Sequence, residues 1–390
     1  MNFVAVSCGA LALLWASACL AATDPNQQSF LLGVQAIARA DYAMAEGILG
    51  PLADQTGQPR VRLELARALY LDRQYRRAKS EFLKVYYRPD LPYGVRRSIN
   101  IFLDDIDQKI GFIQPRLGLA FDTNPSKAAA SGTYDIFGIP LQLERATGLQ
   151  AAGLAYGADF AAPLGSRNLS VVGTVDGAEY RIAGASYVSA NAALRLTDPG
   201  LSGWAEAGAA VYDRDRNDTI YTVFLQRARR FTFDGGRQLT VSATAARNEV
   251  RPLSDYDGFT FQADADLAFD LRPHLAADVA GEASRSTARL RIDERWAGTA
   301  RGTLIGALPK LNKTVMVAVS TNLTRYDAPD PFFGEIRQDR ISRAELTVLH
   351  GSPIHGLFPG VSVSYERDDS TIPFYGYASW ATAFQLRRRF

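Results

Sequence analysis

Few side chains in this sequence could carry covalent or metal chemistry. Of 390 residues only two are cysteine and three are histidine, namely His274, His350 and His355. His350 and His355 could share a metal ion, but their spacing alone is weak evidence, and no cysteine or acidic ligand set accompanies them. A P-loop, a dinucleotide fingerprint and a Gly-x-Ser-x-Gly elbow are also absent from the sequence. The sequence therefore predicts no enzyme, no metal and no cofactor.

Both cysteines, Cys8 and Cys19, lie in residues 1–22, which resemble a secretory signal peptide. The stretch 3–20 is apolar and uncharged, and the small residues Ala21 and Ala22 follow it. Once this segment is removed the chain has no cysteine, which excludes disulfides and thiolate chemistry. Lipid attachment at Cys19 stays open as an alternative, although the leucine usual in a lipid-attachment box is missing.

From residue 112 onward, apolar and polar residues alternate with a period of two, as in strands with one apolar face. In the segment 257–270 large apolar residues and alanines occupy odd positions and polar residues dominate the even ones. Mean hydropathy is only -0.10, because a barrel places its lipid-facing side chains at alternate positions. The pattern predicts a transmembrane antiparallel β-barrel over residues 112–390. A soluble β-sandwich would also alternate, but toward larger aliphatics than the many Ala and Gly residues here.

The chain ends as outer-membrane barrels do, in an alternating strand closed by an aromatic residue. Trp380, Phe384, Leu386 and Phe390 have the same parity and therefore share one face. A terminal aromatic on the lipid face is similar to the signal read by the barrel-insertion machinery. We therefore expect these four residues to direct assembly and the chain to lie in outer-membrane lipid.

The alternation predicts about 14 strands, an even number as in bacterial barrels. They lie near 112–122, 148–162, 167–178, 186–198, 201–213, 219–231, 236–248, 257–270, 274–286, 293–306, 312–325, 336–350, 358–369 and 377–390. Short turns at 163–166, 197–200, 234–236 and 272–273 alternate with longer links at 123–147, 249–256, 326–335 and 370–376. If the short turns lie at the periplasmic end, both ends of the barrel segment lie there too. The domain that precedes the barrel is then predicted to be periplasmic. All three histidines then fall at periplasmic turns, the wrong end for an outer-membrane hydrolase that needs a histidine at its outer rim.

Charged residues occupy the polar face of several predicted strands. We expect them to face the barrel lumen: Asp264, Asp266, Asp278, Glu282, Arg343, Glu345 and Glu366. Such residues could set ion selectivity. The alternative is that they hydrogen-bond across the lumen and brace the wall.

Residues 23–111 show a helical period instead and repeat at an offset of about 33 residues, close to the tetratricopeptide period. The matching positions are Tyr42 with Tyr75, Ala45 with Ala78, Leu49 with Phe82, and Leu52 with Val85. The segment 94–110 is predicted to be a capping helix. By analogy with tetratricopeptide grooves, four residues of the second unit are expected to dock a client: Arg60, Leu63, Arg67 and Tyr70. The alternative is an ordinary solvated helix face.

The order of signal peptide, tetratricopeptide-like helices and a barrel of about 14 strands resembles the surface lipoprotein assembly modifier (Slam) family of type XI secretion. The residues that carry the resemblance are 61–69, 75–82, 92–102 and the Phe-Asp-Thr-Asn-Pro motif at 121–125. The resemblance implies an α+β protein of the Gram-negative cell envelope that helps a surface lipoprotein or small secreted protein cross the outer membrane.

Two functions remain open on the sequence. In the first, the chain is a protein-translocation channel whose periplasmic helices dock the client, with periplasmic chaperones as further partners. In the second, it is a porin-like diffusion channel for small solutes, and the helices contact peptidoglycan or chaperones. A helical domain favours the first, since a simple porin does not need one. A net charge of +2 argues against nucleic acid as a partner.

Overall fold

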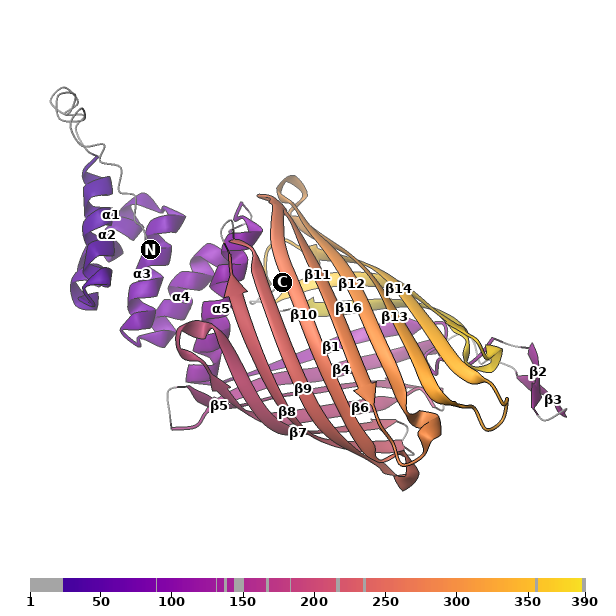
Figure 1. Cartoon of the computed structure of the whole chain (residues 1–390). Coiled ribbons are helices and arrows are strands. Elements are labelled where there is room, and N and C mark those ends of the chain that lie inside the picture. Colours follow the sequence, from indigo (N-terminus) through magenta and orange to yellow (C-terminus); the bar gives the residue numbers. More distant parts are fainter. Residues whose placement is uncertain are drawn as a thin grey trace, which may run out of the picture. The chain divides into compact units, whose positions relative to one another are not determined.

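A computed structural model describes residues 24–387 except 89, 131, 137–138, 144–150, 166–167, 183, 215–217, 234–235 and 355–356 (Figure 1). The expected signal peptide, His355 and Phe390 lie outside the described residues. Contacts divide the chain into two compact units, Met1–Val85 and Tyr86–Phe390. Among the described helices, none has the length and apolarity needed to cross a membrane.

The first unit contains α1 (Pro25–Ala38), α2 (Tyr42–Thr56), α3 (Pro59–Leu71) and most of α4 (Tyr75–Tyr86). Local sequence explains where these helices begin and end. The carboxylates of Asp24 and Asp41 cap α1 and α2 by accepting from backbone amides at 3.0 Å. Gly57 ends α2 in the left-handed conformation, with φ 61°.

The 33-residue offset expected from the sequence reappears in the packing of these helices. Three of the position pairs related by this offset are buried in both repeats: Ala45 and Ala78, Leu49 and Phe82, and Leu52 and Val85. At Gly33 a Cβ atom would lie only 2.5 Å from Leu49 Cδ2, so α1 and α2 approach closely where glycine leaves room. Equivalent residues of the two halves therefore take equivalent core positions.

The second unit consists of α5 (Tyr93–Ile110) and a closed antiparallel barrel of fourteen strands. The prediction of a helical segment followed by such a barrel is confirmed. In chain order the barrel strands are β1 (Phe112–Asp122), β4 (Ala152–Pro163), β5 (Leu169–Tyr180), β6 (Tyr187–Thr197), β7 (Gly203–Arg214), β8 (Asp218–Thr232), β9 (Gln238–Arg251), β10 (Gly258–Arg272), β11 (Leu275–Ser286), β12 (Arg295–Leu308), β13 (Lys313–Pro329), β14 (Ile336–His350), β15 (Phe358–Ser370) and β16 (Tyr377–Arg387).

Neighbouring strands are consecutive in the sequence, and β1 pairs with β16 to close the barrel. Exposure along β10 alternates with its side chains: Phe259 and Phe261 are 51% and 55% exposed, whereas Gln262 and Asp264 are half-buried. The wall therefore presents an apolar outer surface and a polar inner one, because successive strand residues point to opposite faces.

The expected alternation of short turns and longer connections holds only in part. Only three residues join β7 to β8 at the end expected to carry the longer links, and seven join β14 to β15 at the other end. The end with the short turns, such as 198–202 and 273–274, is called the turn end below, and the opposite end is called the loop end. The first connection at the loop end contains a hairpin that the sequence did not predict, formed by β2 (Gly132–Ile136) and β3 (Ile139–Leu143). Figure 1 shows it beyond the barrel wall.

Candidate functional site

α5 spans the turn end of the barrel from one side of the wall to the other (Figure 1). It contacts β10 and β11 on one side and β4 and β5 on the other. In the order of the barrel, β4 and β11 lie seven steps apart out of fourteen, which is diametrically opposite. A helix of 18 residues is about 27 Å long, enough to bridge such an opening. α5 therefore crosses the opening at this end of the barrel.

A carboxylate of the wall holds the N-terminus of α5. Asp270 of β10 accepts a hydrogen bond from Gly94 N at 2.6 Å and pairs with Arg97 at 3.2 Å. Pro92, at the N-cap position, makes no side-chain capping bond, so Asp270 satisfies the helix terminus in its place. The ladder between β10 and β11 shifts register between Asp270 and Arg272, as at a β-bulge, a feature that re-aims side chains.

The C-terminal part of α5 meets β5 and β6. The side-chain oxygen of Gln108 accepts from Thr197 Oγ1 at 3.2 Å and from Ser170 Oγ at 3.5 Å. Gly111, with φ 76°, then joins the helix to β1. The face that the sequence assigned to a capping helix includes Ile99, Leu103 and Ile106, which are buried. By its contacts α5 belongs with the barrel unit.

An aromatic layer anchors the segment before α5 to the turn end. Tyr86 is fully buried, and the Tyr87 ring lies 5.9 Å from the ring of buried Phe358 on β15. Arg96 of α5 stacks near the rings of Tyr86 and Tyr93 and donates to the Arg88 carbonyl at 2.7 Å. Burial lowers the pKa of Arg96 and raises the pKa of Tyr93. This layer makes the segment 86–96 an integral part of the barrel end.

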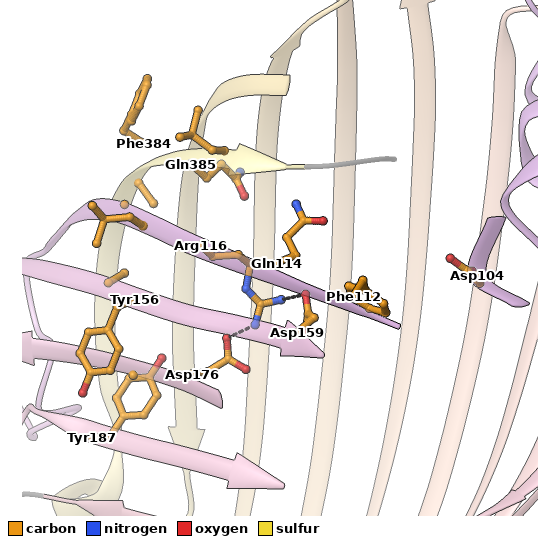
Figure 2. A pocket seen from close by; sticks show the side chains of 16 residues that line it. Asp104, Phe112, Gln114, Arg116, Tyr156, Asp159, Asp176, Tyr187, Phe384 and Gln385 are labelled. Carbon is orange, nitrogen blue, oxygen red and sulfur yellow. Dashed lines mark hydrogen bonds and ion pairs between the residues drawn. The ribbon is translucent and has the colours of Figure 1, made fainter. Parts of the chain in front are cut away.

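A cavity of about 650 Å³ lies beside β1 and is lined by residues of β1, β4, β5, β6, β16 and α5. Figure 2 shows Arg116 of β1 between two carboxylates. It pairs with Asp159 of β4 at 2.7 Å and with Asp176 of β5 at 2.5 Å. Asp104 of α5 also lines the cavity. Arg116 therefore pairs with two carboxylates that lie on neighbouring strands in this part of the lumen.

The structure separates the seven expected lumen charges into two groups. The first group is acidic and lies on β10 and β11, where Asp264 stands opposite Glu282 in the register. Arg301 of β12, which the sequence did not single out, lies 3.4 Å from Asp266 and 3.8 Å from Asp278. Asp264 accepts hydrogen bonds from Ser242 and Gln262.

The second group lies on β14 and β15. Arg343 pairs with Glu345 at 2.8 Å and with Glu366 at 3.6 Å. Glu366 also accepts from the Tyr377 hydroxyl at 2.7 Å and lies 3.2 Å from Lys127. Contacts between neighbouring strands in both groups fit a role in bracing the wall.

A second cavity, of about 570 Å³, lies at the loop end. Three arginines and three tyrosines are among the residues that line it, and the guanidinium of Arg337 lies 3.7 Å from the centre of the Tyr375 ring. Burial, together with a hydrogen bond to Asp330, raises the pKa of Tyr375 to about 12. Tyr375 therefore stays protonated and donates to Asp330 at 2.7 Å.

Both described histidines lie at the turn end. His274 is in the turn between β10 and β11, and His350 is the last residue of β14. The His350 Nδ1 atom lies 2.9 Å from the Ser352 carbonyl, within its own turn. Within the described residues no group of three or more His, Cys, Asp or Glu side chains is placed to hold a metal ion.

The four expected client-docking residues lie on α3. Arg60 and Arg67 are exposed, and Leu63 and Tyr70 are half-buried. The Arg60 guanidinium lies 5.1 Å from the centre of the Phe30 ring, and Arg67 pairs with Glu64 at 3.6 Å. These contacts hold Arg60 and Arg67 on the helix surface.

The described part of the expected assembly signal lies at the end of β16. Trp380 and Phe384 are 56% and 48% exposed on the outer face, and Leu386 is half-exposed. The Trp380 ring lies 4.8 Å from the Tyr365 ring on β15.

Several residues of the lumen were missed by sequence reasoning. Arg116, Asp159 and Asp176 each occupy an inward position of an alternating strand, so parity alone could have placed them inside. Their meeting depends on the register of three strands, which pairs Arg116 with Gly157 and Gly157 with Asp176. Asp270 and Gly94 are separated by 176 residues, and no sequence signal links them.

Comparisons with known proteins give likeness only at the level of solved structures. No protein-family model and no curated protein matches the sequence. Similar structures include OccK10 (OpdN) of Pseudomonas aeruginosa, with TM-score 0.39, 10% identity, and coverage of 70% of this chain and 98% of that one. Another is OmpTdeltaL8, a loop deletion mutant of the Vibrio cholerae outer membrane protein OmpT, with TM-score 0.38, 7% identity, and coverage of 70% and 99%. A third is the outer membrane channel DcaP of Acinetobacter baumannii, with TM-score 0.37, 10% identity, and coverage of 71% and 96%.

Proposed function

We propose that this chain is an outer-membrane β-barrel that assists export of a surface lipoprotein or small secreted protein. The outer surface of a closed barrel with exposed Phe259, Phe261 and Trp380 suits hydrocarbon, and closure leaves the backbone polar groups paired within lipid. The turn end faces the periplasm in this proposal, because short turns usually do. The helical unit then lies in the periplasm and docks the client through Arg60, Leu63, Arg67 and Tyr70.

The observation that best supports the export function is that α5 crosses the turn end of the barrel. α5 is held at both ends, by Asp270 and by Ser170 and Thr197. A passage for small solutes gains nothing from a helix that spans its opening and from four further helices before it. A protein-translocation channel needs both a docking module and an opening that stays closed between clients.

Diffusion of small solutes is the second candidate. The charged lumen favours it, since Arg116, Asp159 and Asp176 line a cavity of about 650 Å³. Side chains of both signs in a polar lumen suit passage of hydrated solutes. In that case α5 narrows the opening without closing it.

Deletion of the gene in its host, followed by quantitative proteomics of shaved cell surfaces and culture medium, tests the export function. We expect one or two proteins to disappear from those fractions while they accumulate in the periplasm. Complementation with Arg60→Glu/Arg67→Glu should restore export less well than complementation with Arg39→Glu/Arg73→Glu, which changes charge equally outside the docking set. An unchanged surface and medium would overturn the export function, and solute uptake would then be measured.

A further inference from the structure

A hollow of about 660 Å³ lies on the outer face of the wall near the loop end, over β12, β13 and β14. These strands are consecutive neighbours in the barrel (Figure 1). Trp296 of β12 and Leu323 of β13 line the hollow and are 59% and 56% exposed. Gly298 lies opposite Leu323 in the register and adds no side chain. The hollow is therefore partly apolar and opens away from the lumen.

Two arginines, Arg325 of β13 and Arg340 of β14, also line this hollow. Arg325 has the parity of exposed Leu323, and Arg340 has the parity of exposed Leu346, so both side chains face outward. Both are exposed. In the ladder Arg325 pairs with Gln338, two residues before Arg340. Such diagonal neighbours lie about 7–8 Å apart, so both guanidinium groups can reach one ligand.

These two arginines differ from other outward arginines of the barrel in having no carboxylate partner. Arg247 of β9 pairs with Glu249 at 3.2 Å, and Arg367 of β15 pairs with Asp369 at 2.7 Å. Arg325 and Arg340 make no ion pair within the part of the chain that the structure describes. Asp369 lies opposite Arg340 in the register but is held by Arg367. Because an unpaired charge on the lipid-facing side of a barrel is unfavourable, an anion from outside the chain would stabilise both arginines.

The hollow lies at the level of an aromatic girdle. Four outward aromatic side chains that are more than half exposed lie within the first four residues of their strands at the loop end: Tyr221, Phe259, Trp296 and Trp380. Aromatic girdles flank the apolar band of outer-membrane barrels at the interface between hydrocarbon and headgroups. An anion that meets Arg325 and Arg340 there is therefore a lipid headgroup.

We propose that this hollow binds a phosphorylated glycolipid of the outer leaflet, of the lipid A type, with a phosphate group between Arg325 and Arg340. The inference rests on the outer-membrane placement and orientation proposed above and not on the export function. Guanidinium groups bind phosphate through paired N–H donors. Trp296 and Leu323 suit the acyl chains, and the exposed amide of Gln338, which also lines the hollow, suits sugar hydroxyls.

Native mass spectrometry of the full-length protein in detergent tests the site. The probe is hexaacylated diphosphoryl lipid A, and phosphatidylglycerol is the comparison lipid, since it has a phosphate and acyl chains but no sugar. We expect one lipid A molecule per barrel and weaker binding of phosphatidylglycerol. Arg325→Gln/Arg340→Gln should weaken lipid A binding by about tenfold or more, because a hydrogen bond to a charged group contributes roughly that factor.

Arg247→Gln/Arg251→Gln is the matched control. It removes the same charge at the same end of the barrel, but both of its arginines pair with Glu249. We expect this variant to bind lipid A as the unmodified protein does. Migration of the folded barrel on unheated gels verifies that each variant assembles.

Three results would each overturn the glycolipid site. The first is an equal loss of lipid A binding in the two double variants, and the second is equal binding of phosphatidylglycerol and lipid A. The third is displacement of lipid A by millimolar inorganic phosphate, which would assign the arginines to a free anion.

The lipid site and the export function fail separately. Loss of the lipid site leaves export standing if the deletion strain still loses its client, and an unchanged surface in that strain leaves the lipid site standing. Recovery of the tagged protein outside the outer-membrane fraction would overturn both.

Discussion

Asp270 and Gly94 make the contact that places α5 across the barrel, with 2.6 Å between the Asp270 carboxylate and the Gly94 amide nitrogen. The same carboxylate pairs with Arg97, so one side chain of β10 both caps the helix and neutralises a charge on it.

Asp270→Ala should loosen the first turn of α5. Loss of a helix cap and its ion pair costs roughly 1–2 kcal/mol, so amides 94–98 should exchange faster by about tenfold in the full-length protein. Hydrogen exchange measured by mass spectrometry checks this, and conductance in planar bilayers should rise. Asp264→Ala is the control, because Asp264 lies on the same strand and bonds to Ser242 and Gln262. Equal effects of the two variants would contradict the capping role.

Gly94→Ala should destabilise the attachment of α5 even though alanine favours helices. An added Cβ would lie 2.7 Å from the Asp270 carboxylate oxygen, closer than real contacts allow. Gly47→Ala in α2 is the control, since its Cβ would meet nothing within 4 Å. That change should stabilise its helix by about 1 kcal/mol. Hydrogen exchange of α5 and α2 in the two variants should therefore move in opposite directions.

Arg116→Gln should make the lumen more cation-selective. Arg116 faces Asp159 and Asp176 at 2.7 and 2.5 Å, and its removal leaves both carboxylates without that cation. The reversal potential in a KCl gradient should shift toward potassium, with a change of about twofold or more in permeability ratio. Asp159→Asn/Asp176→Asn should shift it the other way. If neither variant changes the reversal potential, ions do not pass beside Arg116.

The contact between α3 and α4 should weaken in acid. Burial raises the pKa of Glu81, but hydrogen bonds from Lys84 and Arg62 outweigh burial and leave the pKa below its ordinary value. A lowered folded pKa means that the stabilisation is present above the unfolded pKa of about 4.3 and is lost as the pH falls through the folded pKa. Glu81→Gln should cost about 1 kcal/mol at pH 7 and little near pH 3.

Hydrogen exchange of α4 in the full-length protein, corrected for intrinsic rates at each pH, measures this effect. Asp54→Asn is the control, because the Asp54 side chain is 80% exposed at 3.4 Å from Arg62. A Glu81→Gln effect that persists undiminished at pH 3 would refute the electrostatic origin.

A disulfide between β1 and β16, which close the barrel, should stabilise it more than a disulfide between the consecutive strands β4 and β5. Ala120 and Ala383 face each other across β1 and β16, and Ala155 and Ala178 across β4 and β5. Both pairs point inward at positions without direct backbone hydrogen bonds, and the chain has no other cysteine after residue 19. Because the first bridge closes a much longer loop, its gain should exceed that of the second by about 2 kcal/mol. Urea unfolding in detergent with and without reductant gives the comparison, and equal gains would contradict the loop-length effect.

The barrel could be predicted from the sequence because the alternation of apolar and polar residues within one strand shows which side chains face outward. In β10 the alternation of Phe259, Gln262 and Asp264 assigns every side chain to a face without knowledge of any neighbour. Turn residues such as Pro163 and Pro199 then separate the strands, which yields the count of fourteen found in the structure.

The candidate site was harder to predict from the sequence, because it depends on strand registers and on contacts between residues distant in the sequence. Arg116 and Asp176 meet only when β1, β4 and β5 take a particular alignment. The helical period of 94–110 predicted α5 correctly, but its apolar face fits a neighbouring helix as well as a barrel end. The contact of Asp270 with Gly94 determines where the helix lies, and these two residues are 176 positions apart in the sequence.

The hairpin of β2 and β3 has a practical consequence for work on living cells. Its strands pair only with each other among the described residues, so the barrel ladder does not depend on them. Exposed loop tips with independent backbone bonding are the positions that best accept inserted sequence. A short epitope or dye-binding peptide inserted beside Ile139, which is 69% exposed, would therefore mark the protein for microscopy while leaving the wall intact.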